Sequence, residues 1–313
     1  MTRLQANLLL TAIAVIWASA FVAQNLGMKA IGPVAFTGIR FLLGALVVLP
    51  LAIWEWRRRA AAPLRLRASL PLSAGLGLLL GLGAVLQQIG IVSTTVTNAG
   101  FLTALYVPLV PVFGLLLLKE APHWSVWPGG LACLVGAFLL SGAHELQLNV
   151  GDAWVIASAL PWALHVLFVG RVADRLHAPF LVACAQFVVV GLGNLGWALL
   201  FEPFAFEQVQ QAWWPIAYTG AISVGLAFTA QVVAQRSADA ADAAIILSSE
   251  TLFAALFGAW WLGERLDGQG WLGCGLILGA LLAVQLLPLL HNRLKAGRAE
   301  GVAQLVAQRS DAA

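Results

Sequence analysis

The sequence predicts an all-α integral membrane protein with ten transmembrane helices, arranged as two inverted repeats of five. Three observations predict this fold: the composition, a series of long apolar segments, and an internal repeat. Of the 313 residues, 61% are hydrophobic and 10% are charged, and the mean hydropathy is +0.89. An ordinary soluble domain has roughly 25% charged residues. The composition therefore indicates a protein that lies in a lipid bilayer.

Apolar segments long enough to cross a bilayer follow one another along the chain. A hydrocarbon core of about 30 Å requires roughly 20 residues of helix, and a helix satisfies its own backbone hydrogen bonds in lipid. The alternating pattern of a transmembrane barrel is absent from the sequence. The predicted spans are residues 6–24, 33–53, 70–91, 96–118, 124–141, 152–170, 179–200, 213–235, 242–262 and 270–290.

The basic residues predict the orientation of this bundle, because short loops rich in Lys and Arg stay in the cytoplasm. With a cytoplasmic N-terminus, the cytoplasmic segments hold all of the 17 basic residues except Lys29, Arg40 and Arg265. This asymmetry predicts an even number of spans and places both termini in the cytoplasm. The net charge of +3 comes from these loops, so nucleic acid is not an expected partner.

Several other classes of protein are disfavoured by the motifs. Cys133, Cys184 and Cys274 lie within spans and lack paired or metal-like spacing, so neither disulfides, a metal nor another cofactor is expected. The HExxH, GxSxG and P-loop patterns are absent from the sequence, and an enzyme is therefore not expected. The first span is too long for a removable signal peptide.

An internal repeat connects the two halves of the chain. A shift of 144 residues places TNAGFLTALYVPLVPVFGLLLLKEAPHWSVWPGG over ADAAIILSSETLFAALFGAWWLGERLDGQGWLGC. Because each half has an odd number of spans, the second copy enters the membrane from the opposite side. We predict one five-helix repeat at residues 1–145, an inverted second repeat at 146–290 and a cytoplasmic tail at 291–313. The superposed pairs include Gln87 on Gln231, Asn98 on Asp242, Tyr106 on Glu250, Glu120 on Glu264 and, with a shift of 145, Trp17 on Trp162.

Inverted repeats are typical of secondary carriers, whose binding sites lie near the membrane midplane at the repeat interface. The prediction is therefore a monomeric transporter that moves a small molecule by alternating access around a central cavity in the lipid bilayer. A membrane enzyme and a non-transporting scaffold or channel subunit remain the alternatives.

The segments AVIWASAFVAQNLGMKAIGP, FTGIRFLLGAL, FLTALYVPLVPVFGLLLLKE and ETLFAALFGAWWLGE carry a family resemblance. They resemble the drug/metabolite transporter superfamily, specifically its EamA-type ten-helix members, over about residues 5 to 290. The resemblance implies export of small metabolites, prominently amino acids, across the bacterial inner membrane, and the exporters of aromatic amino acids are a similar subset. Nucleobases and cationic drugs are the alternative substrates. Thr251 departs from the family, since many relatives carry proline there, and Pro108 has no counterpart at Leu252.

Aromatic and polar residues inside the spans are the candidates for substrate contact. Trp17 and Trp162 lie deep in the first and sixth spans, where an indole N–H needs a partner. Cavity lining and core packing are both open for this pair. Phe21 lies one turn after Trp17, and Gln87 and Asn98 supply uncharged donors and acceptors.

Glu250 is a carboxylate inside the otherwise apolar run LSSETLFAALFGAWW. Burial of a charge is costly unless something compensates it, and Glu250 breaks the repeat because its mate is Tyr106. We predict that Glu250 faces the translocation path, where it would hold an amino group or carry a proton. Both proton-coupled and downhill export remain open.

The other polar residues of the spans have competing interpretations. His165 shares a helical face with Trp162 and is either a substrate or proton ligand or an interhelical hydrogen bonder. Arg40 is interpreted as structural, with binding of a substrate carboxylate as the alternative. Glu120 and Glu264 are interpreted as structural. The predicted substrate-binding residues are Trp17, Phe21, Gln87, Asn98, Phe101, Tyr106, Trp162, His165 and Glu250.

Overall fold

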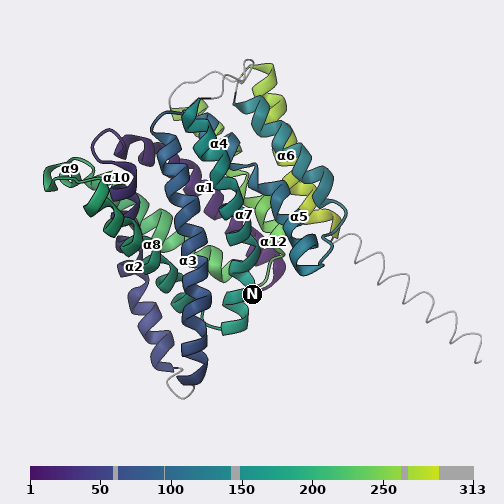
Figure 1. The fold of residues 1–313 in the computed structure, drawn as a ribbon. Helices are drawn as coiled ribbons and strands as arrows, with labels where there is room; N and C mark the ends of the chain where they lie inside the picture. The colour runs from purple at the N-terminus through teal and green to yellow at the C-terminus, as the bar shows by residue number, and fades with distance from the viewer. Residues whose placement is uncertain (59–62, 95, 142–148, 262–266, 289–313) are drawn as a thin grey trace, which may run out of the picture.

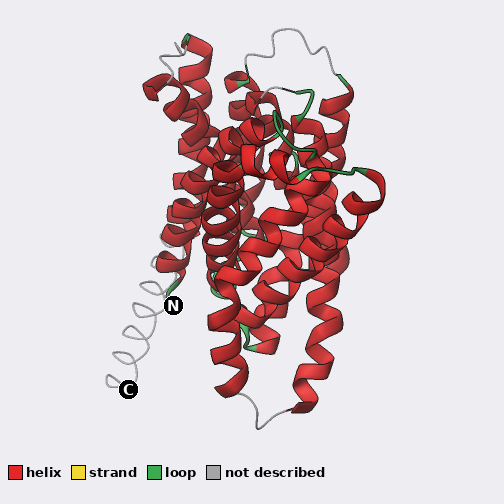
Figure 2. Ribbon diagram, turned by 90° about the vertical axis from the view of Figure 1, so that its left-hand side faces the viewer, coloured by secondary structure: helices red, strands yellow, loops and turns green. Residues whose placement is uncertain are grey.

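The computed structural model describes residues 1–58, 63–94, 96–141, 149–261 and 267–288. Within these residues all regular secondary structure is helical, and the helices lie side by side in one bundle (Figures 1 and 2). The predicted all-α fold is confirmed for this part of the chain. Glu264 and the predicted tail at residues 291–313 lie outside the described residues.

The helices vary widely in length, from 6 to 29 residues. They are α1 (Arg3–Gly27), α2 (Pro33–Arg58), α3 (Pro63–Ile91), α4 (Val96–Thr103), α5 (Tyr106–Leu118), α6 (Val126–Leu140), α7 (Val150–Leu176), α8 (Pro179–Phe201), α9 (Phe206–Gln211), α10 (Trp213–Tyr218), the π-helix η1 (Thr219–Phe228), α11 (Thr229–Ala234), α12 (Ala240–Leu247), α13 (Glu250–Trp261) and the helix Gly268–Pro288.

Eight helical segments among the described residues are long and apolar enough to cross a membrane. They correspond to eight of the predicted spans. The two other predicted spans differ: the span predicted at 124–141 contains the shorter apolar helix α6, and the described part of the span predicted at 242–262 is divided between α12 and α13. The structure therefore shows a helical protein suited to a membrane, in which some of the predicted spans are shorter or interrupted.

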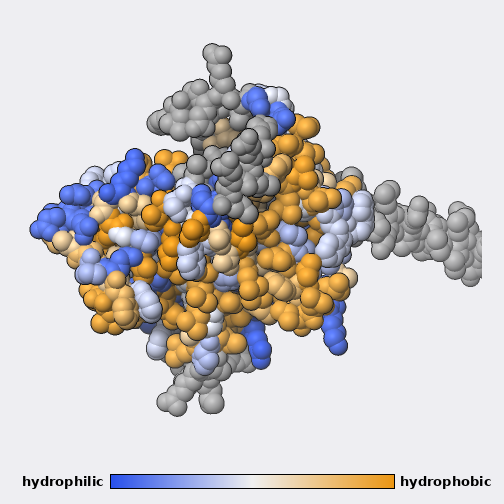
Figure 3. All heavy atoms as spheres, turned by 45° about the horizontal axis from the view of Figure 1, so that its top comes forward, coloured by the Kyte–Doolittle hydropathy of each residue, from blue (hydrophilic) through white to orange (hydrophobic). Residues whose placement is uncertain are grey.

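Large apolar side chains cover much of the outer surface of the bundle. Leu46 is 63% exposed, Leu116 is 67% exposed and Leu199 is 65% exposed. Figure 3 shows hydrophobic residues over most of one face, with the hydrophilic residues gathered mainly toward its edges. Exposed apolar surface of this extent is unusual in a soluble monomer and is the surface that lipid covers in a membrane protein.

The first helices of the two predicted halves begin in the same way. The Thr2 hydroxyl accepts a hydrogen bond from the Gln5 backbone N–H at 3.2 Å, and the Gln5 side chain accepts one from the Thr2 N–H at 2.9 Å. Asn149 and Asp152 form the same reciprocal box at the start of α7, with both distances 2.9 Å. Such boxes satisfy backbone N–H groups that lack partners within the helix.

Two helical segments are interrupted at equivalent places. α4 ends at Thr103 and α5 begins at Tyr106, whereas α12 ends at Leu247 and α13 begins at Glu250. The 144-residue shift relates both pairs of boundaries. Discontinuous helices at corresponding positions of two repeats are typical of transporters, where they surround the binding site.

One end of the bundle gathers several ion pairs. Arg3 lies 3.5 Å from Asp239 and also pairs with Asp242. Arg171 pairs with Glu120. These contacts join elements of the first predicted half, α1 and the end of α5, to elements of the second half, α7 and the start of α12 (Figure 1).

Candidate functional site

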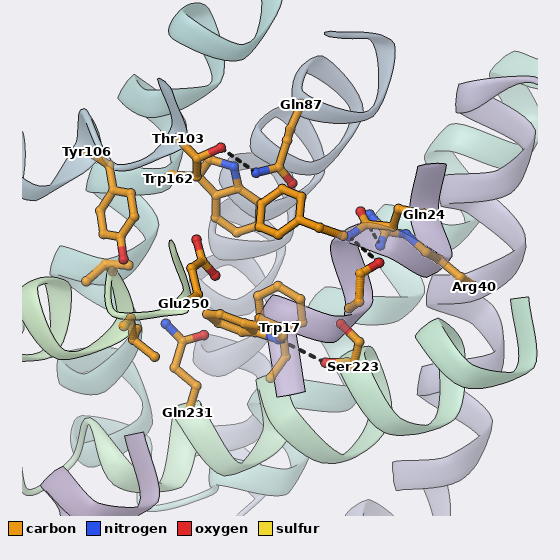
Figure 4. A pocket seen from close by; sticks show the side chains of 15 residues that line it. Trp17, Gln24, Arg40, Gln87, Thr103, Tyr106, Trp162, Ser223, Gln231 and Glu250 are labelled. Atoms are coloured by element: carbon orange, nitrogen blue, oxygen red, sulfur yellow. Dashed lines mark hydrogen bonds between the residues drawn. The ribbon is translucent and has the colours of Figure 1, made fainter. Parts of the chain in front are cut away.

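A small cavity lies inside the bundle where α1, α2, α3, α7, η1 and the two interrupted helical segments meet (Figure 4). The cavity has a volume of about 50 Å³, counted as the space that the centre of a water molecule can occupy. This is enough for a few ordered waters. The lining combines aromatic rings, amides and charged groups. The residues labelled in Figure 4 are Trp17, Gln24, Arg40, Gln87, Thr103, Tyr106, Trp162, Ser223, Gln231 and Glu250.

The two tryptophans form an aromatic wall around Phe228. The ring centroids of Trp17 and Phe228 are 4.5 Å apart, and Trp162 stacks on Phe228 at 5.9 Å with an interplanar angle of 5°. The Trp17 indole N–H donates to the Ser223 carbonyl at 3.3 Å. Ser223 belongs to η1, and π-helical turns are rare and frequent at functional sites.

Trp162 is held against α3 by the absence of a side chain at Gly83. A Cβ atom at Gly83 would lie 3.0 Å from the Trp162 ring. The Trp162 indole N–H has no hydrogen-bond partner among the described residues, although the residue lines the cavity. An indole N–H in this position is available to a bound molecule.

Tyr106 and Glu250 lie at the equivalent starts of α5 and α13. The Tyr106 hydroxyl donates to the Ala244 carbonyl at 3.2 Å. Glu250 is 6% exposed, and its carboxylate has no hydrogen bond or ion pair with any residue that the structure describes. In Figure 4 the Glu250 carboxylate points into the space beside Trp17.

Two glutamines that are repeat mates also line the cavity. The Gln87 amide donates to the Thr103 hydroxyl at 2.8 Å. The Gln231 amide donates to the Gln235 side chain at 2.8 Å, and Gln235 in turn donates to the Val166 carbonyl at 2.9 Å. These bonds orient both amides and leave the Gln231 oxygen without a partner among the described residues.

Arg40 lines the side of the cavity opposite Glu250 (Figure 4). It is 3% exposed and donates from Nη1 to the Gln24 oxygen at 2.8 Å. Its guanidinium carbon lies 5.5 Å from the Phe36 ring centroid and 5.3 Å from that of Phe41. The contacts on α2 and α1 support a structural role, and the position in the lining makes the guanidinium available to a ligand as well.

Six of the nine predicted substrate-binding residues come together around this cavity: Trp17, Phe21, Gln87, Tyr106, Trp162 and Glu250. The other three lie outside its lining. Asn98 is half-buried in α4.

Phe101 packs edge-on against Phe138, with the ring centroids 5.7 Å apart. His165 is fully buried, and its Nε2 lies 2.8 Å from the Gln186 side-chain oxygen. That contact joins α7 to α8 and corresponds to the interhelical alternative for His165. These neighbours keep both side chains away from the cavity in this conformation.

Some residues that line the cavity were not predicted, although the internal repeat points to two of them. Gln231 is the mate of Gln87, and Val166 is the mate of Phe21 with the 145-residue shift. Both residues would have been predicted if the repeat mate of each candidate had also been taken as a candidate. Phe228 and Ser223 have no such signal, because their places depend on ring stacking and on the π-helical backbone.

The part of the chain that the structure describes places no metal-binding cluster in the cavity. Among the described residues no group of three or more His, Cys, Asp and Glu side chains is placed to hold an ion. The polar groups of the lining are instead suited to hydrogen bonding and ion pairing with an organic molecule.

A second cavity lies at the ion-paired end of the bundle. It has about 140 Å³ of space open to the centre of a water molecule. Glu120, Arg171, Asp239 and Asp242 line it, so members of both sets of ion pairs contribute to its wall.

Comparison with known proteins supplies the family context. The profile of the EamA-like transporter family matches residues 4–142 and again residues 149–286. An uncharacterized transporter of Archaeoglobus fulgidus is 30% identical over 285 residues, which is 91% of this chain and 87% of that protein. The uncharacterized transporter YoaV of Bacillus subtilis is 24% identical, with 86% and 91% of the two chains covered.

An exporter with a named substrate is also similar to the chain. The threonine/homoserine exporter RhtA of Escherichia coli is 26% identical over 297 residues, with 92% of this chain and 93% of that protein covered. A crystal structure of a protein with 20% sequence identity superposes with a TM-score of 0.75 over 91% of this chain and 98% of that chain. At this identity the structural likeness concerns the fold alone.

Proposed function

Because the chain belongs to the EamA-like transporter family, we propose that it is a secondary transporter that exports small metabolites by alternating access. The principal substrates are amino acids, above all aromatic or other apolar ones. In this proposal the protein is a monomer in the bacterial inner membrane, with both termini in the cytoplasm. The chain crosses the bilayer ten times, and residues 1–145 and 146–290 form two inverted five-helix repeats.

The convergence of repeat mates on one cavity is the observation that carries the proposal. Trp17 and Trp162, Gln87 and Gln231, and Tyr106 and Glu250 are three pairs related by the repeat, and all six residues line the cavity. Residues related by a pseudo-two-fold axis meet only near that axis. This is the location of the substrate site in carriers built from inverted repeats.

The chemistry of the lining supports amino acids as the substrate class. Trp17, Trp162 and Phe228 offer apolar surface for a side chain, and Gln87 and Gln231 offer amides for polar groups. One relative, the threonine/homoserine exporter RhtA of Escherichia coli, is named for substrates of this same class. Nucleobases and cationic drugs are the alternative solutes, and a scaffold without transport is the alternative of another class.

Efflux from proteoliposomes tests the proposal. Vesicles that contain the purified full-length chain are loaded with radiolabelled amino acids, nucleobases or cationic drugs, and loss of label is compared with empty vesicles. We expect efflux of apolar amino acids that falls by about ten-fold or more in Trp162→Phe or Glu250→Gln, because the first change removes the indole N–H from the lining and the second removes the carboxylate. Trp271→Phe is the matched control, since Trp271 is 59% exposed on the outer surface.

The outcomes separate the classes of function. Amino acid efflux that depends on the lining residues supports the proposal. Efflux of nucleobases or drugs alone would replace the substrate class. If no solute leaves faster than from empty vesicles, or if every lining variant equals the wild type, the carrier mechanism is wrong.

A further inference from the structure

The cavity contains two buried charges of opposite sign that the repeat does not duplicate. Arg40 belongs to the first half, where the shifts of 144 and 145 residues place it over Cys184 and Ala185. Glu250 belongs to the second half and has Tyr106 as its mate. The duplicated frame therefore folds with uncharged residues at the equivalent places, and each charge needs a separate explanation.

Arg40 has more donors than the protein uses. A guanidinium carries five N–H donors, and the recorded hydrogen bond is the one from Nη1 to Gln24. The Nε atom is buried without a partner among the described residues. The rings of Phe36 and Phe41 fix the position of the guanidinium and give it no counter-charge. A ligand carboxylate would supply both the charge and the missing acceptors.

Glu250 lacks a positively charged partner among the residues that the structure describes. Its carboxylate lines the cavity without an ion pair or hydrogen bond to any residue that the structure describes. The start of α13 gives partial compensation, because backbone N–H groups at a helix N-terminus favour negative charge. A ligand ammonium in the cavity would complete the compensation, since a buried charge is stable chiefly when it is paired.

We propose that the cavity selects ligands that carry both an ammonium and a carboxylate, with Glu250 receiving the ammonium and Arg40 the carboxylate. Figure 4 shows the two side chains on opposite sides of the cavity, with Trp17 and Trp162 beside the space between them. The apolar part of the ligand lies against this aromatic wall. The inference rests on the proposed function, because it identifies this cavity as the transport site.

The two charges exclude the other solute classes by leaving a buried group unpaired. A cationic drug pairs with Glu250 and brings a second positive charge to a cavity that already contains Arg40. A neutral nucleobase leaves both charges without a counter-ion. Discrimination of this kind arises from unsatisfied buried groups in the wrong complex.

Three molecules that share one side chain test the two subsites separately. L-Phenylalanine carries both charges, phenethylamine carries only the ammonium and 3-phenylpropanoate carries only the carboxylate. Binding of radiolabelled L-phenylalanine to the purified full-length chain in nanodiscs is measured in competition with each compound. L-Threonine with 1-aminopropan-2-ol and 3-hydroxybutanoate forms a second set with a smaller side chain. We expect each amino acid to compete at least about ten-fold more strongly than its two analogues, because each analogue lacks one charge-assisted contact.

Two variants assign the subsites. Arg40→Gln should weaken L-phenylalanine by about ten-fold and leave phenethylamine unchanged, because only the carboxylate contact is lost. Glu250→Gln should weaken L-phenylalanine and leave 3-phenylpropanoate unchanged. The matched controls are Arg58→Gln on the same helix as Arg40 and Glu207→Gln in α9, since both residues are exposed.

Melting temperature and gel filtration show whether each variant folds. If a variant does not fold, the competition between the amino acids and their analogues for the wild-type protein tests the proposal by itself. The inference is wrong if either analogue competes as strongly as its amino acid, if neither amino acid binds, or if the two folded variants weaken all three compounds equally. Efflux assays separate this result from failure of the proposed function. Amino acid efflux with equal competition by the analogues removes the two-charge site alone, whereas absence of efflux for every solute removes the transport function.

Discussion

At the residue scale, the structure distinguishes polar groups that the fold uses from those that it leaves available. His165 Nε2 bonds to Gln186 Oε1 between α7 and α8, away from the cavity lining, while His165 Nδ1 and Gln186 Nε2 are buried without a partner among the described residues. Glu250 and the Trp162 indole N–H lack partners among the described residues, although both residues line the cavity. A polar side chain that bonds to a neighbour within the fold contributes to stability, whereas an unpaired polar group that lines a cavity is suited to binding.

The His165 contact makes a prediction about stability. His165→Leu should destabilise the protein by about 1–3 kcal/mol, because it leaves the Gln186 side chain buried without its partner. Efflux per folded molecule should stay within about two-fold of the wild type, since the affected groups lie outside the cavity lining. Unfolding in detergent and efflux from proteoliposomes measure the two effects.

A double variant is the control for this interpretation. His165→Leu combined with Gln186→Leu removes both partners and should recover part of the lost stability. If His165→Leu instead abolishes efflux in a protein of normal stability, His165 takes part in transport and the structural interpretation is wrong.

At the element scale, the interruptions of the two helical segments do not depend on proline. Pro108 lies in the first turn of α5, while the equivalent residue in α13 is Leu252. Both helices nevertheless begin at equivalent residues. Proline in a first turn removes no intrahelical hydrogen bond, so Pro108 fits the start of α5 without causing it. The difference in proline content noted in the sequence therefore does not prevent the two halves from adopting the same interruption.

Substitutions at these two positions test whether the interruption of the helices and the efflux depend on proline. Pro108→Ala should change the free energy of unfolding by less than about 1 kcal/mol and keep efflux near the wild-type rate, because the backbone hydrogen bonds stay the same. Leu252→Pro introduces the proline of the first half at the matched place in α13 and is the companion variant. Loss of efflux in a folded Pro108→Ala protein would identify Pro108 as a required hinge.

At the scale of the whole molecule, the ion pairs at one end connect the two halves. Arg3 joins α1 to the start of α12, and Arg171 of α7 pairs with Glu120 after α5. The Arg171 and Glu120 side chains are 37% and 59% exposed, so solvent screens them and their contribution to overall stability is small. In the proposed alternating-access mechanism, their position between the halves would influence which end of the molecule opens.

Breaking one of these pairs should favour opening at that end. We expect Arg171→Gln to increase the labelling rate of a cysteine at Val166, a cavity residue, by a few-fold in inside-out vesicles, because a differential contact of about 1 kcal/mol shifts a two-state equilibrium by about that factor. The background replaces Cys133, Cys184 and Cys274 with alanine. A maleimide that does not cross membranes provides the measurement.

The charge-swapped protein, Glu120→Arg with Arg171→Glu, is the control and should return labelling to the wild-type rate. Equal labelling in the wild type, the single variant and the swapped protein would show that this ion pair does not hold the two halves together at this end.

Composition, segment length and the internal repeat predicted a helical protein that lies in a lipid bilayer and consists of two similar halves. Composition and segment length determine these features because a backbone in lipid has few ways to satisfy its hydrogen bonds, and the 144-residue repeat is visible in the letters alone. Trp17 and Trp162 became candidates as repeat mates deep in their spans, and Glu250 as a carboxylate in an apolar run; all three line the cavity.

Which polar residues share the cavity depends on contacts between segments that are distant in the sequence. His165 lies one turn from Trp162 on the same helix, yet a partner on α8 holds it away from the cavity. Arg40 and Glu250 are far apart in the sequence and come from different halves, and packing alone places them around one space. Helical periodicity predicts which face of its helix a residue occupies. The neighbour that meets this face depends on contacts between distant segments, and these contacts decide whether a polar group is satisfied or left available for a ligand.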